Sequence, residues 1–281
     1  MAADLLNLGG RVVVVSGAAG GGIGTSVTRL LSEAGAIVVA VSRSQDNLDT
    51  HIGPLVSEGL PVVPVAADAA TDDGISAAMD AARKAGPLHG LVNVAGGAEP
   101  GTWMPSTRVS RPDWRNLLQQ NLETMFFMSQ AVAAELQALR RPGSIVSISS
   151  ISGMNTAPLH IGYGTAKAAV VAVTRTMAVE LARSGIRVNA VAPGVTATPA
   201  SRTYVDDDEE RDRQAIAMGR RGTPEEIAGV IAFLLSDLST YVTGQTLLVD
   251  GGLNLKWTHL AADNTSLFLK DQGFREAIKQ W

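Results

Sequence analysis

The chain has 281 residues, a net charge of −4 and no cysteine. Thiol catalysis and disulfide cross-links are therefore excluded, and nothing indicates a basic surface for nucleic acid. Apolar residues make up 46% of the chain, which is enough for a substantial core. The longest stretch without acidic or basic residues other than histidine, 142–166, is rich in Ser, Gly and Pro and does not predict a membrane helix. The first ten residues lack a basic apolar leader, so we expect a soluble cytoplasmic protein.

Short runs of apolar and β-branched residues predict buried strands along the chain. They lie at 11–16, 37–42, 61–66, 88–94, 144–149, 186–191 and 246–249. Longer segments with a helical pattern separate them, which is typical of repeated βαβ units with helices on both faces of a parallel sheet. We therefore predict a single α/β domain over residues 1–252, with a Rossmann-type doubly wound sheet of about seven strands.

A glycine-rich segment, Ser16–Gly24 (SGAAGGGIG), directly follows the first predicted strand, and a predicted helix at 25–34 comes next. Glycine allows a tight turn and a close approach of ligand to backbone, and the N-terminus of a helix attracts phosphate. By itself a glycine-rich run would indicate only a flexible loop. Its position between a strand and a helix predicts dinucleotide binding.

The second predicted strand ends at Ser42 and Arg43. An acidic residue at this place would accept hydrogen bonds from the ribose 2′-hydroxyl of NAD. Ser42 takes that place, and the guanidinium of Arg43 is suited to a 2′-phosphate. The sequence therefore favours NADP(H) and leaves NAD(H) open, the alternative being that Arg43 only points into solvent.

Tyr163 and Lys167 are four residues apart in a segment with a helical pattern. Residues at this spacing share a helix face, with Cβ atoms about 5–6 Å apart, and a nearby cation favours the phenolate. We expect Lys167 to lower the pKa of Tyr163, so that the phenol acts as a general acid/base at cellular pH. An isolated pair of this kind would usually mark an ordinary helix surface, and the accompanying motifs favour chemistry.

Together these motifs resemble the short-chain dehydrogenase/reductase family over residues 8–252, and its 3-oxoacyl reductase members in particular. The glycine segment is similar to the family's Thr-Gly-x-x-x-Gly-x-Gly loop, although four residues rather than three separate Gly17 from Gly22. The segment 93–96 (NVAG) resembles the family's Asn-Asn-Ala-Gly motif, with valine replacing the second asparagine. The closing segments 241–245 (YVTGQ) and 249–252 (VDGG) are also similar.

The resemblance implies a catalytic set of Asn121, Ser150, Tyr163 and Lys167. Tyr163 would donate a proton to the developing alkoxide, Ser150 would hydrogen-bond the same oxygen, and Lys167 would also hold the nicotinamide ribose. Asn121, in a segment expected to form a long apolar helix, would hold a water that links Lys167 to solvent. The neighbouring Ser149 is the alternative to Ser150, and a structural cap or kink is the alternative role for Asn121.

The resemblance also implies a set of cofactor contacts that includes an adenine-side aspartate and the segment after the sixth strand. The set comprises Gly17, Gly22, Ile23, Gly24, Ser42, Arg43, Asp68, Asn93, Ala95, Gly96, Tyr163, Lys167, Pro193, Gly194, Val195 and Thr198. Val195 would offer its backbone to the nicotinamide carboxamide, and Thr198 its hydroxyl. No metal is expected, because the four histidines are scattered along the chain.

The implied function is hydride transfer between a nicotinamide and a ketone or secondary alcohol, with NADPH-dependent reduction of a 3-oxoacyl-type carbonyl favoured. An NAD-dependent secondary-alcohol or steroid dehydrogenase is the alternative enzyme, and a nucleotide-sensing binding protein is the alternative without chemistry.

The segments 97–112, 151–161 and 199–221 are expected to shape the substrate pocket. The last resembles a mobile lid, although its acidic run at 206–210 would otherwise indicate a solvated helix face. His160 is interpreted as a loop residue, and Arg108, Arg111 and Arg202 are candidate contacts for an anionic carrier or coenzyme.

Two further features concern assembly. The consecutive apolar residues 125–128 (MFFM) cannot all face one core, so some are expected to meet a partner helix in a homotetramer or dimer. Residues 253–281 form a C-terminal extension that is expected to be ordered and packed on the domain or on a partner subunit. It holds four of the twelve aromatic residues, Trp257, Phe268, Phe274 and Trp281, and disordered tails are poor in such residues.

Overall fold

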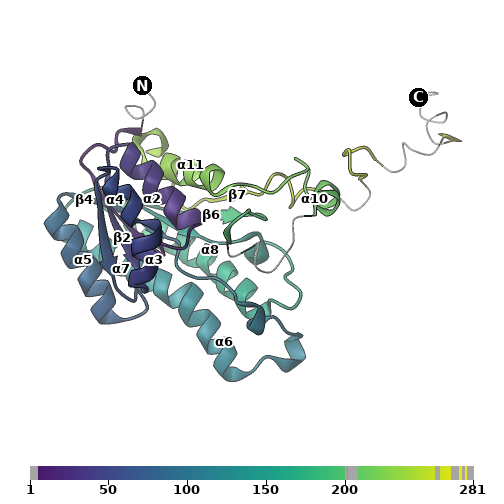
Figure 1. The fold of residues 1–281 in the computed structure, drawn as a ribbon, viewed down its shortest axis with the longest axis horizontal. Helices are drawn as coiled ribbons and strands as arrows, with labels where there is room; N and C mark the ends of the chain where they lie inside the picture. The colour runs from purple at the N-terminus through teal and green to yellow at the C-terminus, as the bar shows by residue number, and fades with distance from the viewer. Residues whose placement is uncertain are drawn as a thin grey trace.

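The computed structural model describes residues 6–199, 201, 208–256, 260–266, 272–273 and 276. Within these residues seven parallel strands form one sheet in the order β3-β2-β1-β4-β5-β6-β7 (Figure 1). The strands are β1 (Val12–Ser16), β2 (Ile37–Ser42), β3 (Val62–Ala66), β4 (Leu88–Asn93), β5 (Gly143–Ile148), β6 (Ile186–Pro193) and β7 (Thr246–Val249). All seven predicted strands are confirmed, and their ends differ from the predicted ones by no more than two residues.

Helices flank the sheet on both sides, as the sequence predicts. They are α2 (Ile23–Glu33), α3 (Gln45–His51), α4 (Gly53–Ser57), α5 (Asp72–Ala85), α6 (Arg111–Leu118), α7 (Thr124–Ala138), α8 (Ile161–Leu181), α10 (Glu209–Ala215) and α11 (Pro224–Leu235). The alternating side chains of β1 separate the two sides of the core. Val13 and Val15 pack with α2 and α11, whereas Val12 and Val14 pack with α5, α7 and α8. The sheet is therefore buried on both faces and doubly wound.

Local sequence signals set several helix starts. Thr71 accepts a hydrogen bond from the backbone N–H of Gly74 and caps α5, and Ser110 caps α6 in the same way. At α11, Thr223 and Glu226 form a reciprocal capping box. Such caps satisfy backbone donors that a helix leaves free in its first turn.

The order of the strands reverses between β1 and β4. From β1 the chain moves outward through β2 and β3, and it then returns to β4 on the other side of β1. The carboxyl ends at such a reversal are where open α/β sheets bind ligands. Asn93 fixes this edge, because its Nδ2 donates to Ser129 Oγ at 2.8 Å and to Ser147 Oγ at 3.1 Å.

The part of the C-terminal extension that the structure describes contacts the segment around α10. Lys256 Nζ donates to the backbone oxygen of Arg213 at 2.6 Å, and Asn264 Nδ2 donates to that of Ala217 at 2.7 Å. Asn155, from the loop after β5, hydrogen-bonds Asn254. The four aromatic residues of the extension lie outside the described residues, so the packing expected of them stays a prediction.

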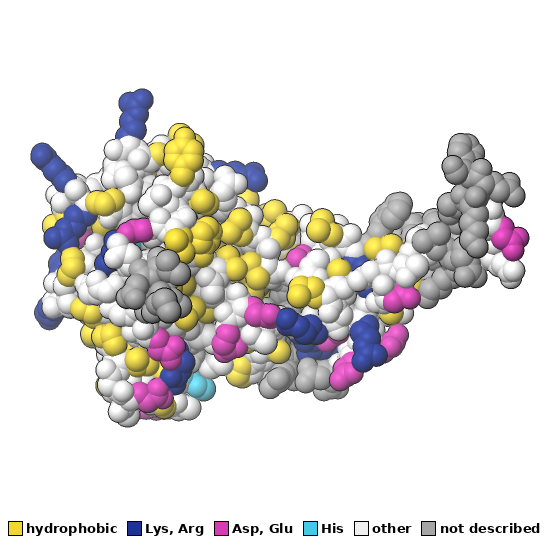
Figure 2. All heavy atoms as spheres, turned by 90° about the horizontal axis from the view of Figure 1, so that it is seen from above, with side chains coloured by type: hydrophobic (Ala, Val, Ile, Leu, Met, Phe, Trp, Pro, Cys, Tyr) yellow, Lys and Arg dark blue, Asp and Glu magenta, His cyan; other side chains and the backbone are white. Residues whose placement is uncertain are grey.

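The outer surface carries exposed apolar side chains. Figure 2 shows hydrophobic side chains gathered across the middle of the face that bears α11 and β7. In this part of the chain Leu238, Tyr241 and Leu248 are exposed. No helix among the described residues is long and apolar enough to cross a bilayer.

Candidate active site

The glycine loop between β1 and α2 passes very close to the chain after β4. Gly17 has a φ of +76°, and a Cβ atom on it would lie 2.5 Å from the backbone nitrogen of Ala95. A larger residue at Gly17 is therefore excluded on both counts. At the other end of the loop, a Cβ on Gly22 would lie 3.1 Å from Thr198 Cγ2. The loop thus brings together three of the segments expected to hold a cofactor.

The N-terminus of α2 suits a phosphate. Gly22 is its capping residue and has no side chain that could cap the helix, and the first turn, which holds Ile23 and Gly24, has no acidic residue. The backbone N–H groups there are free to bind an anion, and the macrodipole of the helix favours one. The residues present therefore fit the pyrophosphate of a dinucleotide.

The adenosine side of the site is formed by the ends of β2 and β3. Ser42 is the last residue of β2, and Arg43, which follows it, is exposed and has no ion pair among the described residues. Asp68 follows β3, and its Oδ1 accepts a hydrogen bond from the backbone N–H of Ala70 at 3.0 Å. This bond fixes the turn that leads into α5.

On the opposite side, the segment after β6 lies against the end of β7. Gly194, next to Pro193, packs so closely that its Cβ would be 2.7 Å from the Cα of Asp250. Val195 accepts a backbone hydrogen bond from Gly222 at 3.0 Å, and Thr198 Oγ1 accepts one from the backbone N–H of Ser201 at 3.1 Å.

Tyr163, Ser150 and Lys167 lie together at the carboxyl ends of β5 and β6. Tyr163 and Lys167 belong to α8, and Lys167 Nζ is 5.6 Å from the centroid of the phenol ring. Ser150 follows β5, and its hydroxyl lies near enough to the Tyr163 phenol to lower the pKa of that group. An acid/base group, a hydroxyl and an ammonium therefore share one site.

The two adjacent serines have different partners. Ser149 is buried, and its hydroxyl donates to the backbone oxygen of Lys167 at 2.8 Å. Ser150 accepts from the backbone N–H of Ser152 at 3.1 Å and contacts the phenol. This geometry favours Ser150 over Ser149 as the residue that would touch a substrate oxygen.

Lys167 is only 3% exposed, and its Nζ donates to the backbone oxygen of Ile148 at 2.9 Å. Burial lowers the pKa of Lys167 to about 8, because removal from water disfavours the charged amine. The ammonium is therefore held at the end of β5, and its pKa lies close to neutral pH.

The pKa of Tyr163 corrects one expectation. Burial raises the pKa of the phenol above its ordinary value, and the Ser150 hydroxyl offsets only part of that rise. The predicted lowering by Lys167 is wrong for the protein alone, because desolvation raises the pKa and the ammonium, which is bonded to Ile148, is not among the groups that lower it. The phenol is therefore protonated at neutral pH.

Asn121 corrects a second expectation. It does not lie in an uninterrupted α-helix, because residues Gln119–Glu123 form a π-helical turn between α6 and α7. The side chain is buried, accepts from the backbone N–H of Gly97 at 2.8 Å, and donates to the backbone oxygens of Gly97 at 2.8 Å and Leu117 at 3.1 Å. Such turns are frequent at functional sites.

Gly96 joins Asn121 to Lys167. A Cβ on Gly96 would lie 2.6 Å from Asn121 Oδ1 and 3.4 Å from Lys167 Nζ. The structure therefore brings all four members of the implied catalytic set into one place, around the chain that follows β4.

Aromatic rings extend from the phenol into the expected substrate segments. The ring centroids of Trp103 and His160 are 3.8 Å apart, with an angle of 67° between the ring planes. Those of His160 and Tyr163 are 6.0 Å apart, with an angle of 90°. Burial lowers the pKa of His160, which favours its neutral form. His160 directly precedes α8 as its capping residue, and together with Trp103 it forms a wall beside the phenol.

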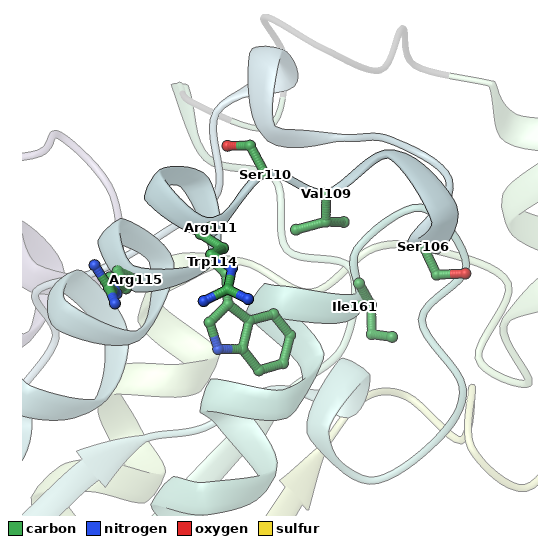
Figure 3. A pocket seen from close by; sticks show the side chains of 7 residues that line it. All are labelled: Ser106, Val109, Ser110, Arg111, Trp114, Arg115 and Ile161. Carbon is green, nitrogen blue, oxygen red and sulfur yellow. The ribbon is translucent and has the colours of Figure 1, made fainter.

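A cavity of about 440 Å³ lies beside α6 and the start of α8 (Figure 3). Its lining residues are Ser106, Val109, Ser110, Arg111, Trp114, Arg115 and Ile161. Of the three arginines considered for an anionic carrier, Arg111 lines this cavity, Arg108 does not, and Arg202 lies outside the described residues.

The chain resembles known proteins over most of its length. A family model described as enoyl-(acyl carrier protein) reductase matches residues 17–254. The 3-oxoacyl-[acyl-carrier-protein] reductase FabG of Thermotoga maritima is 39% identical over 251 residues, which cover 88% of this chain and 99% of the relative.

Two solved structures show the same likeness. A gluconate 5-dehydrogenase from Burkholderia cenocepacia J2315, in complex with NADP and tartrate, has a TM-score of 0.82 at 34% identity and covers 90% of this chain and 99% of its own. A 7α-hydroxysteroid dehydrogenase complexed with NADH and 7-oxo glycochenodeoxycholic acid also has a TM-score of 0.82, at 32% identity. It covers 89% of this chain and 96% of its own.

The chain belongs to the short-chain dehydrogenase/reductase family, as its motifs indicate. It is an oxidoreductase with a Rossmann fold.

Proposed function

We propose that this protein transfers a hydride between a nicotinamide dinucleotide and a ketone or secondary alcohol, and that it mainly reduces 3-oxoacyl-type carbonyls with NADPH. The convergence of Ser150, Tyr163 and Lys167 beside the glycine loop carries this proposal. A nucleotide sensor without chemistry would not require a phenol and an ammonium at this place.

The bound nicotinamide supplies the hydride for reduction, or accepts it in the reverse reaction. The chain would hold the dinucleotide with the free N–H groups of α2, with Arg43 and Asp68 on the adenosine side, and with Val195 and Thr198 on the nicotinamide side.

Tyr163 would act as the proton donor during reduction. Its raised pKa keeps the phenol protonated at neutral pH, which is the form that reduction requires. As the carbonyl carbon gains the hydride, the oxygen takes the phenolic proton, and Ser150 hydrogen-bonds that oxygen while its negative charge develops. Loss of the proton leaves a phenolate, which the ammonium of Lys167 would stabilise.

Asn121 would position the route by which the phenol regains its proton. Its amide donates to Gly97 and Leu117 and accepts from Gly97, so it holds the backbone around Gly96 and Gly97 beside the ammonium. In this arrangement Asn121 orders the surroundings of Lys167.

The preference for NADP(H) rests on Arg43 and on the absence of an acidic residue at the end of β2. The gluconate dehydrogenase relative is described with NADP and the hydroxysteroid dehydrogenase relative with NADH, so the family contains both. An NAD-dependent steroid dehydrogenase is the second candidate, because the rings of Trp103 and His160 beside the phenol offer an aromatic surface to an apolar ring-shaped ketone.

We further propose that the protein assembles as a homodimer or homotetramer. In α7, Met125 and Met128 are buried, whereas Phe127 is 46% exposed, so the apolar run faces two ways as the sequence predicts. In α8, Val179 is 80% exposed. These faces of α7 and α8 are suited to partner subunits, and so is the hydrophobic face near β7 that Figure 2 shows.

Replacement of Tyr163 by Phe tests the function. Turnover of a panel of ketones and alcohols, followed by cofactor absorbance with both nucleotides, is expected to fall by about a hundredfold or more, because a general acid contributes at least that factor. Cofactor affinity, measured by fluorescence titration, is expected to change little. Substantial turnover by Tyr163→Phe would refute the assignment of the proton donor.

A further inference from the structure

The glycine loop contains one residue more than the family's pattern, and a histidine from a neighbouring helix covers the longer part. Between Gly17 and Gly22, Gly20 is exposed and Gly21 adopts a φ of +66°. The N–H of Gly21 donates to Thr25 Oγ1 at 3.1 Å, and Thr25 in turn donates to the backbone oxygen of Ala18 at 2.9 Å. The longer loop therefore has a defined shape.

His51, the last residue of α3, lies directly against Gly21. A Cβ on Gly21 would lie 2.9 Å from Cε1 of His51, 3.2 Å from Nε2 and 3.3 Å from Nδ1. The edge of the imidazole that carries both nitrogens therefore faces the loop. Only glycine leaves room for the ring, and its positive φ is also one that larger residues rarely adopt.

The nitrogens of this half-buried ring have no hydrogen-bond partner among the described residues, and they remain accessible to water. An imidazole always carries at least one N–H donor, and no protein group in the described part of the chain occupies the donor of His51. The ring can therefore pair with an acceptor that binds at the loop.

The expected ligand supplies such an acceptor. Residues 17–25 contain no charged side chain, so any basic side chain that contacts a phosphate at this loop comes from another segment. Arg43 and His51 both belong to the segment that leaves β2, and they lie at its start and at the end of α3. In this fold the end of β2 meets the adenosine ribose, whereas the N-terminus of α2 meets the pyrophosphate.

We propose that His51 donates a hydrogen bond to the 2′-phosphate of NADP(H), so that with Arg43 it determines the cofactor preference. This inference rests on the proposed use of a nicotinamide dinucleotide. It gives the longer glycine loop a role, because the additional length lets Gly21 support the imidazole.

Dissociation constants for NADPH and NADH, measured by fluorescence titration of the full chain, test this role. His51→Phe keeps a ring against Gly21 but removes both nitrogens. It should weaken NADPH binding about tenfold to a hundredfold and leave NADH binding nearly unchanged, because a hydrogen bond to a charged group is lost. His51→Gln, which retains an N–H donor, should keep more of the NADPH affinity. Thr50→Ala, at an exposed position of the same helix, is the matched control and should bind both nucleotides like the wild type.

Equal weakening for the two nucleotides would overturn the assignment, because it would mean that the ring only supports the loop or contacts the shared pyrophosphate. Unchanged NADPH binding in His51→Phe would overturn it as well. Melting temperatures of the variants identify any folding defect. Turnover of the wild type with either nucleotide upholds the proposed oxidoreductase function whatever the His51 variants do, so the two proposals fail separately.

Discussion

The ammonium of Lys167 donates a hydrogen bond of 2.9 Å to the backbone oxygen of Ile148, and it does so in a nearly water-free environment. A backbone oxygen stabilises the charge but does not neutralise it, so burial still lowers the pKa of the amine to about 8. Lys167 is therefore charged below that pH and neutral above it.

The pH dependence of reduction should report this titration. As the pH rises through about 8, the site loses the charge that stabilises the developing phenolate, so kcat/KM for reduction should fall by about tenfold per pH unit above it. The quantity kcat/KM follows the free enzyme, to which this pKa belongs. Lys167→Arg, whose guanidinium stays charged, should be slower but should lose the decline near pH 8. A wild-type profile that stays level up to pH 9.5 would contradict this role of the ammonium.

The two serines after β5 give a second prediction. Ser150→Ala removes the hydroxyl that contacts the phenol and should lower kcat by about a hundredfold to a thousandfold, as loss of one oxyanion donor does. Ser149→Ala removes the bond to the backbone of Lys167 and should mainly lower the free energy of unfolding, by about 1–3 kcal/mol. Steady-state kinetics and urea denaturation of both variants separate these effects. The reverse result would assign the catalytic role to Ser149.

A third prediction concerns cofactor choice. Arg43→Asp replaces a cation with the acidic residue that would accept hydrogen bonds from the ribose 2′-hydroxyl of NAD. The ratio of kcat/KM for NADP(H) to that for NAD(H) should fall by about tenfold to a hundredfold or more. Arg141→Asp, an exposed position after α7, makes the same charge change away from the nucleotide and should leave the ratio unchanged. If Arg43→Asp leaves the ratio as it is, Arg43 only points into solvent.

The strands were predictable from the sequence because they depend on local periodicity. Each predicted strand is a short apolar run, and the structure places it within two residues of its predicted ends. The place of the glycine loop was predictable too, because the segment lies between β1 and α2 as its neighbouring patterns indicate.

Features that depend on contacts between distant segments were not predictable in this way. The π-helical turn at Asn121 arises where the side chain bonds Gly97, which lies on another segment, and no local signal marks it. The spacing of Tyr163 and Lys167 gave the correct neighbours but the wrong direction for the pKa of the phenol, because burial cannot be obtained from a spacing of four residues. His51 was only one of four scattered histidines until the fold placed it on Gly21.

The C-terminal extension gives the last prediction. Lys256 and Asn264 donate to backbone oxygens of Arg213 and Ala217, at α10 and just after it, within the segment expected to close over the substrate. These two bonds should favour the closed arrangement of that segment. A chain that ends at Leu255 keeps the region matched by the family model but loses both bonds. Its KM for the ketone should rise about threefold to tenfold with a smaller change in kcat, because each lost bond contributes about 1 kcal/mol at most to closure.

The double variant Lys256→Ala/Asn264→Ala in the full chain is the matched control, since it removes the two donors and keeps the rest of the extension. It should reproduce most of the rise in KM and keep the oligomer mass measured by light scattering. If KM rises only in the shortened chain, and its oligomer mass changes as well, the extension acts through subunit assembly rather than through the segment around α10. Wild-type kinetics and mass in both proteins would mean that the extension has no part in substrate binding.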